Sequence, residues 1–150
     1  MKALAVNLSN NILLRGQQDG FSITPMKLQK LLYYVCCDYV KETGQMPIDE
    51  QFEVWQYGPV LPSVYWEFKS FGPNPIKAFA KDASGRARKV SEDDNPTLAR
   101  ILDIVWAKYK RMSGIALSKQ THMAGSGWLK AFLDGRETIS LEDMRNDTSG

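Results

Sequence analysis

Residues 24–40 read Thr-Pro-Met-Lys-Leu-Gln-Lys-Leu-Leu-Tyr-Tyr-Val-Cys-Cys-Asp-Tyr-Val, and this stretch predicts the clearest helix of the chain. Thr24 is a favourable N-cap, and Pro25 stands at the first helical position, where its missing N–H costs no hydrogen bond. Gly44 ends the helical pattern, and Pro47 confirms the stop. One face forms a continuous apolar stripe, which indicates burial against a core. This stripe consists of Leu28, Leu31, Leu32, Val35, Tyr39 and Val40.

Further elements are predicted from the same kinds of signal. The segment Phe52–Trp55 alternates like a strand, and Arg88–Val90 is the candidate to pair with it as an antiparallel ribbon. The residues Tyr57–Pro62 form a stiff turn, and residues 72–83 are irregular. Apolar periodicity and capping residues predict the remaining helices over residues 1–15, 63–70, 96–109, 113–122 and 128–133, with a short one after Ser140.

Together these elements predict a mainly α protein, a compact single-domain bundle of about five to seven helices with a small two- or three-stranded β element. At 150 residues, with 43% apolar and 24% charged residues, the chain has the composition of one ordinary globular domain. We expect the domain proper to span residues 1–136. Residues 137–150 are expected to form a short helix and a tail that frays from Asp147 to Gly150.

Charge argues against nucleic acid as the main partner. The net charge is only +2, and the densest basic run, Arg86–Lys89, is soon followed by the acidic Glu92–Asp94. This pattern is typical of a solvated turn rather than a phosphate-binding track. The first apolar pattern is interrupted by Asn7, Asn10 and Asn11, so neither a signal peptide nor a membrane span is expected.

The two cysteines, Cys36 and Cys37, are neighbours on the predicted helix and point about 100° apart, so they cannot form a disulfide with each other. Two free thiols indicate a reducing compartment, the cytoplasm. A nucleophilic cysteine would need His122 beside an exposed thiol, whereas Cys36 lies between Val35 and Val40. We interpret both cysteines as small buried hydrophobic residues, and a Cys–His enzyme stays an alternative hypothesis.

Other sites of chemistry lack their motifs. One histidine and two adjacent cysteines form no zinc-binding pattern. The glycines of Gly125–Gly127 lack the lysine and the preceding strand of a phosphate-binding loop. We therefore expect no metal, no cofactor and no catalytic residue, and we expect the chain to act by binding another protein.

Two features allow both a structural and a functional interpretation. His122 either packs against Trp128 and hydrogen-bonds across the loop, or belongs to a recognition surface. The rigid turn Tyr57–Val60 either serves the fold alone or presents a pre-ordered aromatic edge to a partner.

Three motifs in order resemble the Panacea domain, a family of phage-associated and bacterial proteins. They are the Thr-Pro-Met-Lys-Leu-Gln-Lys-Leu-Leu-Tyr-Tyr run of residues 24–34, the Phe-Glu-Val-Trp-Gln-Tyr-Gly-Pro-Val run of residues 52–60, and Thr121-His122 followed by Trp128. The resemblance extends from the first helix to about residue 133. Residues 72–95 match no motif, and in such families the variable part often sets the choice of partner.

The resemblance implies a type II antitoxin that neutralises a protein toxin by direct contact, with small alarmone-synthetase-like enzymes among the toxins of the family. It also implies an alternative, because a relative acts as a proteolytic adaptor that delivers its toxin to a AAA+ protease. Some relatives carry a DNA-binding domain before the shared one, but here the shared pattern starts near Met1. DNA binding by this chain alone is therefore not expected.

The candidates for contacts with the partner are polar or aromatic residues off the apolar stripes or on the rigid turn. On this criterion we predict an exposed patch made of Lys27, Lys30, Tyr34, Tyr57, Gly58, Pro59, Trp66 and His122.

Overall fold

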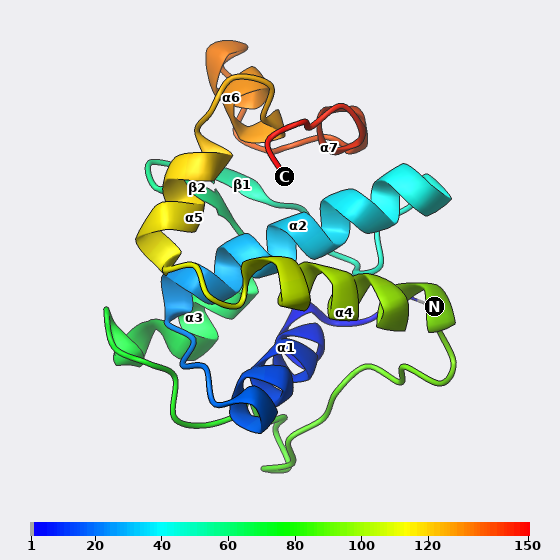
Figure 1. The fold of residues 1–150 in the computed structure, drawn as a ribbon, viewed down its shortest axis with the longest axis vertical. Helices are drawn as coiled ribbons and strands as arrows, with labels where there is room; N and C mark the ends of the chain where they lie inside the picture. Colours follow the sequence, from blue (N-terminus) through cyan, green and yellow to red (C-terminus); the bar gives the residue numbers. More distant parts are fainter. Residues whose placement is uncertain (1) are drawn as a thin grey trace.

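The computed structural model describes residues 2–150. This part of the chain folds into seven α-helices, one 3-10 turn and one two-stranded sheet (Figure 1), which confirms the predicted mainly α single domain with a small β element. The strands are β1 (Glu53–Trp55) and β2 (Gly58–Val60). The helices are α1 (Ala5–Asp19), α2 (Pro25–Thr43), α3 (Pro62–Phe68), α4 (Pro96–Tyr109), α5 (Gly114–Thr121), α6 (Gly127–Leu133) and α7 (Leu141–Arg145), and the 3-10 turn η1 is Lys69–Phe71.

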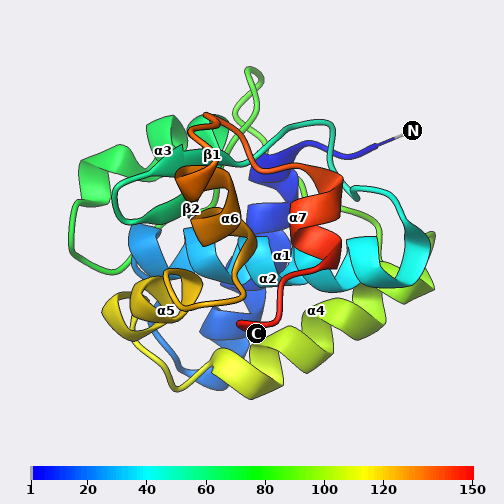
Figure 2. The same cartoon turned by 90° about the horizontal axis from the view of Figure 1, so that it is seen from above.

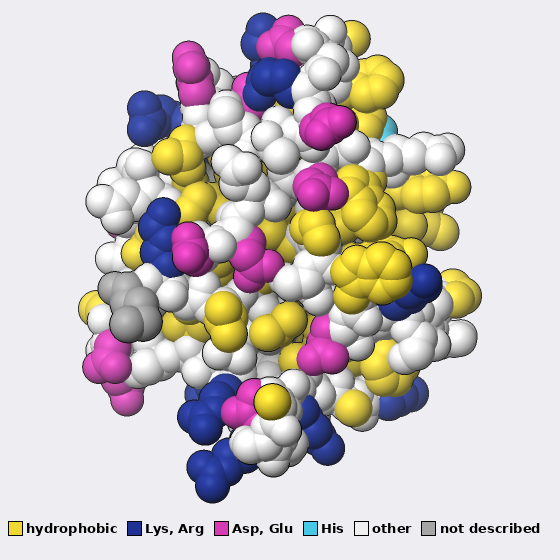
Figure 3. Space-filling view, turned by 180° about the vertical axis from the view of Figure 1, so that it is seen from behind, with side chains coloured by type: hydrophobic (Ala, Val, Ile, Leu, Met, Phe, Trp, Pro, Cys, Tyr) yellow, Lys and Arg dark blue, Asp and Glu magenta, His cyan; other side chains and the backbone are white. Residues whose placement is uncertain are grey.

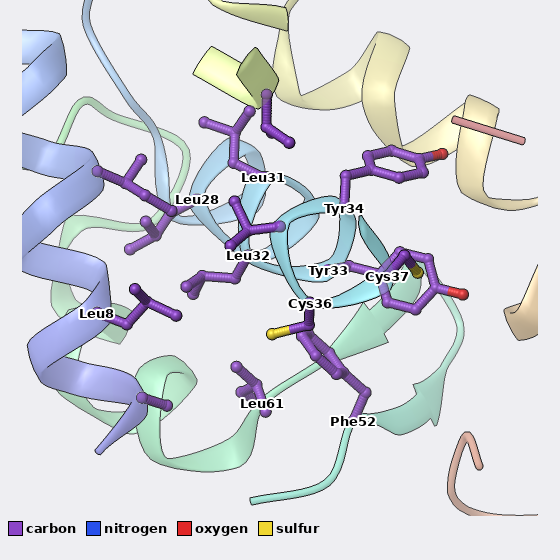
Figure 4. Close-up of a cluster of buried hydrophobic side chains, with 14 of the residues drawn as sticks. Leu8, Leu28, Leu31, Leu32, Tyr33, Tyr34, Cys36, Cys37, Phe52 and Leu61 are labelled. Atoms are coloured by element: carbon purple, nitrogen blue, oxygen red, sulfur yellow. The ribbon is translucent and has the colours of Figure 1, made fainter. Parts of the chain in front are cut away.

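Helix α2 lies in the middle of the molecule. Its ends are those predicted, since the Thr24 hydroxyl accepts from the Lys27 N–H at 3.2 Å and Gly44 adopts the left-handed conformation with a φ of 76°. The helix packs against α1, α3, α4, α5, α7 and β2. Figure 4 looks along α2 and shows side chains leaving it in every direction, from Leu28 toward α1 to Tyr34 toward the opposite side. Twelve of its nineteen residues are buried, so α2 is a core helix rather than a surface helix with one wet face.

The strand partner predicted for Phe52–Trp55 is wrong. β1 pairs in antiparallel fashion with β2, with Glu53 opposite Val60 and Trp55 opposite Gly58. A two-residue turn joins them, so the pairing needs almost no loop closure, which a partner at Arg88–Val90 would require. The other edge of β1 is covered by the bridge between Glu53 and Thr138.

Two buried asparagines of α1 anchor the long segment between η1 and α4. The Asn10 amide donates to the carbonyl oxygens of Ala80 at 2.9 Å and Arg88 at 2.7 Å, and its oxygen accepts from the Ala80 N–H at 2.8 Å. The Asn11 amide exchanges two hydrogen bonds with the backbone of Val90, at 2.9 and 2.8 Å. The segment has little regular secondary structure. The two asparagine side chains therefore supply the hydrogen bonds that its backbone would otherwise make with a neighbouring strand.

The structure buries the first residue of the segment that is expected to fray, residues 147–150. Asp147 is buried, with 1% of its surface exposed. Its carboxylate accepts from the Tyr33 hydroxyl at 2.6 Å and from the Gly127 N–H at 2.9 Å. The buried Tyr33 hydroxyl and the first N–H of α6 both need a hydrogen-bond acceptor. The Asp147 carboxylate is that acceptor, and this holds the C-terminal tail in place.

The asparagine anchor generates a stability prediction. We expect Asn10→Ala to lower the free energy of unfolding by about 2–4 kcal/mol, because it removes two buried hydrogen bonds to Ala80 and one part-buried hydrogen bond to Arg88. Urea denaturation measures this change, and hydrogen exchange should show faster exchange of the amides over residues 80–90.

The matched control is Asn7→Ala, since Asn7 lies on the same helix and its side chain makes no hydrogen bond within residues 2–150. It should change the stability by less than about 0.5 kcal/mol. If both substitutions lower the free energy of unfolding equally, Asn10 does not anchor the segment.

Candidate partner-binding surface

The structure divides the eight predicted contact residues into two groups. The turn and helix residues Tyr57 and Trp66 are exposed, at 62% and 65%, and His122 is half-buried. The prediction that the other five are exposed is wrong, because they lie in the interior. The buried members are Lys27, Lys30, Tyr34, Gly58 and Pro59.

Lys27 caps the C-terminal end of the neighbouring helix α4 and does not face solvent. Its ammonium group donates to the Lys110 carbonyl at 2.5 Å and lies 5.7 Å from the centre of the Trp106 ring. A cation is favoured there, because the last carbonyls of a helix carry a partial negative charge. Burial lowers the pKa of Lys27 from its ordinary value.

Lys30 is buried beneath the rigid turn, with 1% of its surface exposed. Its ammonium group donates to the Pro59 carbonyl at 3.0 Å. Gly58 has a φ of 117°, and a Cβ there would lie 2.7 Å from the Thr121 hydroxyl oxygen and 3.0 Å from the Lys30 Cε. Glycine is thus required both by the backbone conformation and by the close packing of Lys30. Burial lowers the pKa of Lys30 to about 7.

Tyr34 fills the space between α2, α4 and the C-terminal residues. Its ring stacks on Tyr109 with centroids 5.1 Å apart, and its hydroxyl lies 2.9 Å from the Ser149 hydroxyl. Burial raises its pKa above the ordinary value. The side chain is therefore a core residue that helps hold the tail.

His122 makes the structural contacts of the first interpretation. Its ring lies 4.1 Å from the Trp128 ring, and its two nitrogens lie 2.6 Å from the Ser118 carbonyl oxygen and 2.8 Å from the Gln56 carbonyl oxygen. These contacts hold α5, α6 and the β1–β2 turn together. A role in partner recognition stays a prediction for this residue.

A run of aromatic side chains joins α3, β1 and α6 along one side of the molecule. Trp128 is buried, Trp55 and Tyr65 are half-buried, and the outer rings are exposed. Trp55 contacts Tyr65 with ring centroids 4.8 Å apart, and Tyr65 contacts Trp66 at 5.4 Å. The Trp128 indole N–H donates to the Trp55 carbonyl at 2.9 Å, and its ring stacks on Phe132 at 5.1 Å. We call the whole set the aromatic band, which consists of Trp55, Tyr57, Tyr65, Trp66, His122, Trp128 and Phe132.

The outer members of the aromatic band are open to solvent. Trp66 is 65%, Tyr57 62% and Phe132 56% exposed, and the neighbouring Leu133 is 72% exposed. Figure 3 shows hydrophobic side chains gathered along the edge that also carries the histidine. Exposed aromatic residues that are close together are the usual mark of a protein-binding surface.

Sequence reasoning found Tyr57, Trp66 and His122 but missed Trp55, Tyr65, Trp128 and Phe132 as members of one surface. The signal for Phe132 was its position four residues after Trp128 on a short helix, which places the two rings on one face. The contact between β1 and α6 joins residues more than seventy positions apart and has no local signal.

The two cysteines are buried, with 0% and 1% of their surface exposed, and neither forms a disulfide. Burial raises the pKa of both thiols, so they stay protonated near neutral pH. The ring nitrogens of His122 face backbone carbonyls rather than a thiol. The structure therefore forms no Cys36–His122 or Cys37–His122 pair.

Within residues 2–150, no group of three or more His, Cys, Asp and Glu side chains is placed to hold a metal ion. In the same part of the chain, no helix is both long enough and apolar enough to cross a membrane.

The fold and this surface define a class, a small helical domain that presents a preformed and exposed aromatic band. The chain matches the family model described as Antitoxin SocA-like, Panacea domain, over residues 28–129, and it belongs to this family. The resemblance drawn from the three motifs is thus confirmed.

A curated relative, Antitoxin SocA of Caulobacter vibrioides (strain NA1000 / CB15N), is 31% identical to this chain over 124 residues. The alignment covers 81% of this chain and 66% of the relative, so the chain spans just under two thirds of that protein's length. No solved structure gives a significant match.

The buried Lys30 generates a prediction about pH. Its pKa is about 7 in the folded protein and 10.5 in a free side chain, so the unfolded chain binds the proton more tightly between these values. Stability from this group is therefore present above about pH 10.5 and is lost as the pH falls toward 7. As the pH rises through this window, we expect the free energy of unfolding of wild type to increase relative to that of Lys30→Met by up to about 1.4 kcal/mol per pH unit.

Urea denaturation of both proteins at pH 6.5, 8 and 9.5, that is over roughly three units, measures this difference. Lys119→Met, at an exposed lysine of α5, is the control and should follow the wild-type profile. If the free energy of unfolding changes with pH in the same way for Lys30→Met and wild type, Lys30 keeps an ordinary pKa in the folded protein.

Proposed function

We propose that this chain is the antitoxin of a type II toxin–antitoxin system and neutralises a protein toxin by direct binding. Its family is an antitoxin family, and the curated relative carries the name antitoxin. The observation that carries the proposal is the aromatic band, because its exposed rings Tyr57, Trp66 and Phe132 offer a partner apolar surface. The resemblance implies alarmone-synthetase-like enzymes as one class of toxin, and bacterial or prophage genomes as the setting.

The band has the properties of an interaction hot spot. Its side chains are aromatic, so burying each against a partner yields a large contact area with few rotatable bonds to order. The rings brace one another and are anchored by the bond from the Trp128 indole to the Trp55 carbonyl at 2.9 Å. Little conformational entropy is therefore lost on binding.

Trp66 is well placed to be the leading anchor of the contact. It is 65% exposed, its edge rests on Tyr65, and the Lys69 ammonium group lies 4.6 Å from its ring centre. The cation–π contact and the neighbouring ring hold the indole in one orientation. A toxin that buries this ring would gain on the order of 2 kcal/mol, as hot-spot tryptophans do.

The test of the proposal uses the product of the reading frame adjacent to the gene of this chain, which we expect to be the toxin. We expect Trp66→Ala/Phe132→Ala to raise its Kd by at least about 30-fold, measured by calorimetry, while the melting temperature changes by less than about 3 °C. Growth arrested by the toxin should no longer recover when this variant is expressed.

Ile104→Ala/Leu141→Ala is the matched control, since these residues are exposed apolar side chains, at 50% and 43%, on α4 and α7. The control should bind like wild type. If the band variant restores growth as well as the control does, the band is not the toxin-binding surface.

The mode of neutralisation is tested by the lifetime of the toxin. Direct neutralisation predicts that the toxin half-life in cells is unchanged or longer when this chain is present, and that an inactive complex can be purified. A toxin that disappears faster in its presence, in a manner that requires a AAA+ protease, would establish the adaptor hypothesis instead.

A further inference from the structure

Residues 81–89 form a hairpin that projects from the body of the molecule. Lys81 and Ala87 form an antiparallel bridge, and the Asp82 N–H donates to the Arg86 carbonyl at 2.8 Å. All nine residues are exposed, and the hairpin stands clear of the helices at the top of Figure 2. It contributes nothing to the hydrophobic core, so burial does not explain its structure.

The hairpin is nevertheless held in place at both of its legs. Asn10 binds Ala80 before the hairpin and Arg88 within its second leg, and Asn11 binds Val90 directly after it. Two buried side chains of α1 thus fix the point from which the hairpin projects. An arm without such anchors would lose more conformational entropy on meeting a partner.

The tip of the hairpin is ordered as well. One carboxylate oxygen of Asp82 accepts from the Ser84 N–H at 2.9 Å, the Ser84 hydroxyl at 2.6 Å and the Arg86 N–H at 3.0 Å. The other accepts from the Arg88 guanidinium at 2.6 Å. These hydrogen bonds lower the pKa of Asp82, so the tip stays ordered through the physiological pH range.

Positive charge is concentrated on this arm. The nine residues hold four basic side chains and one acidic side chain, a formal charge of +3, whereas the whole chain carries +2. Arg88 is paired with Asp82, but Lys81, Arg86 and Lys89 take part in no ion pair within residues 2–150. Figure 3 shows several dark blue side chains at the bottom of the molecule, where the hairpin lies, besides those on other parts of this face.

We propose that the hairpin of residues 81–89 is a second, electrostatic contact arm that binds an acidic surface of the protein toxin. This inference rests on the proposed function and adds the charge of the surface that the toxin presents. Three unpaired cations on an ordered projection attract an acidic surface from a distance and raise the association rate.

A protein surface fits the arm better than nucleic acid does. The Asp82 carboxylate lies within the hairpin, where it pairs with Arg88, and the acidic residues Glu92–Asp94 follow the second leg. A continuous phosphate backbone would therefore meet negative charge both in the hairpin and beside it. Nucleic-acid surfaces use longer basic tracks with a larger excess of charge.

The test is Lys81→Glu/Arg86→Glu/Lys89→Glu, measured by stopped-flow association with the product of the adjacent reading frame, the expected toxin. We expect the association rate constant to fall at least about tenfold at 0.15 M salt, with a smaller dependence on salt than wild type. The melting temperature should stay within about 2 °C, since all three side chains are exposed.

Lys2→Glu/Lys108→Glu/Arg145→Glu is the control of equal charge change. These residues are exposed, lie outside the hairpin and form no ion pair within residues 2–150. The association rate constant of the control should fall much less than that of the hairpin variant. An equal fall would show a general effect of net charge and overturn the inference.

The remaining outcomes separate the inference from the proposed function. If wild type binds the toxin and the hairpin variant associates as fast, the arm does not contact the toxin and the proposed function stands. If wild type does not bind, the proposed function fails, and the arm assigned to the toxin fails with it. A 20-base-pair DNA duplex is the second probe, and loss of duplex binding with unchanged toxin association would assign the arm to nucleic acid.

Discussion

Every polar group that is buried with α2 needs a hydrogen-bond partner. The arrangement of the elements around α2 follows from this requirement. An unpaired polar group in a dry core costs on the order of 1–3 kcal/mol, and a charge costs more. Each buried polar side chain of α2 meets this need by binding the backbone or side chain of a distant segment. Lys27 binds the end of α4, Gln29 exchanges two hydrogen bonds with Leu61 at 3.1 and 2.8 Å, Lys30 binds Pro59, and Tyr33 binds Asp147. Helix α2 therefore positions the rest of the chain through its polar residues as much as through its apolar ones.

The same constraint explains the motifs by which the chain resembles its family. Residues of the first motif bind residues of the second, since Lys30 donates to Pro59 and Gly58 packs against Lys30 and Thr121. His122 completes the unit by its contact with Gln56. These motif residues build a rigid frame that carries the β1–β2 turn, α3, α5 and α6. The aromatic band is formed by outward side chains on that frame, and the basic hairpin projects from a segment that matches none of the motifs.

Local signals were sufficient to predict the helices but not their surroundings. Capping residues such as Thr24 and Gly44 marked the ends of α2 correctly, because capping depends on neighbours in the sequence. The outward placement of Lys27, Lys30 and Tyr34 was wrong, because periodicity identifies an apolar stripe and does not reveal whether a second face is covered. Long side chains can bury their stems and still reach a carbonyl, as Lys30 does. The pairing of β1, the anchoring by Asn10 and the burial of Asp147 depend on contacts between distant residues, which no local pattern contains.

We infer that the polar face of α2 is structural and propose that partner binding occurs elsewhere. Thermal unfolding of Lys27→Glu/Lys30→Glu tests it most directly, with Lys108→Glu/Lys119→Glu, two exposed lysines, as the control. We expect the buried pair of substitutions to lower the melting temperature by at least about 10 °C, because each carboxylate would be buried opposite a carbonyl oxygen. The control should shift it by less than about 2 °C. If the variant instead melts at the wild-type temperature and loses only its affinity for the partner, Lys27 and Lys30 are contact residues and not structural ones.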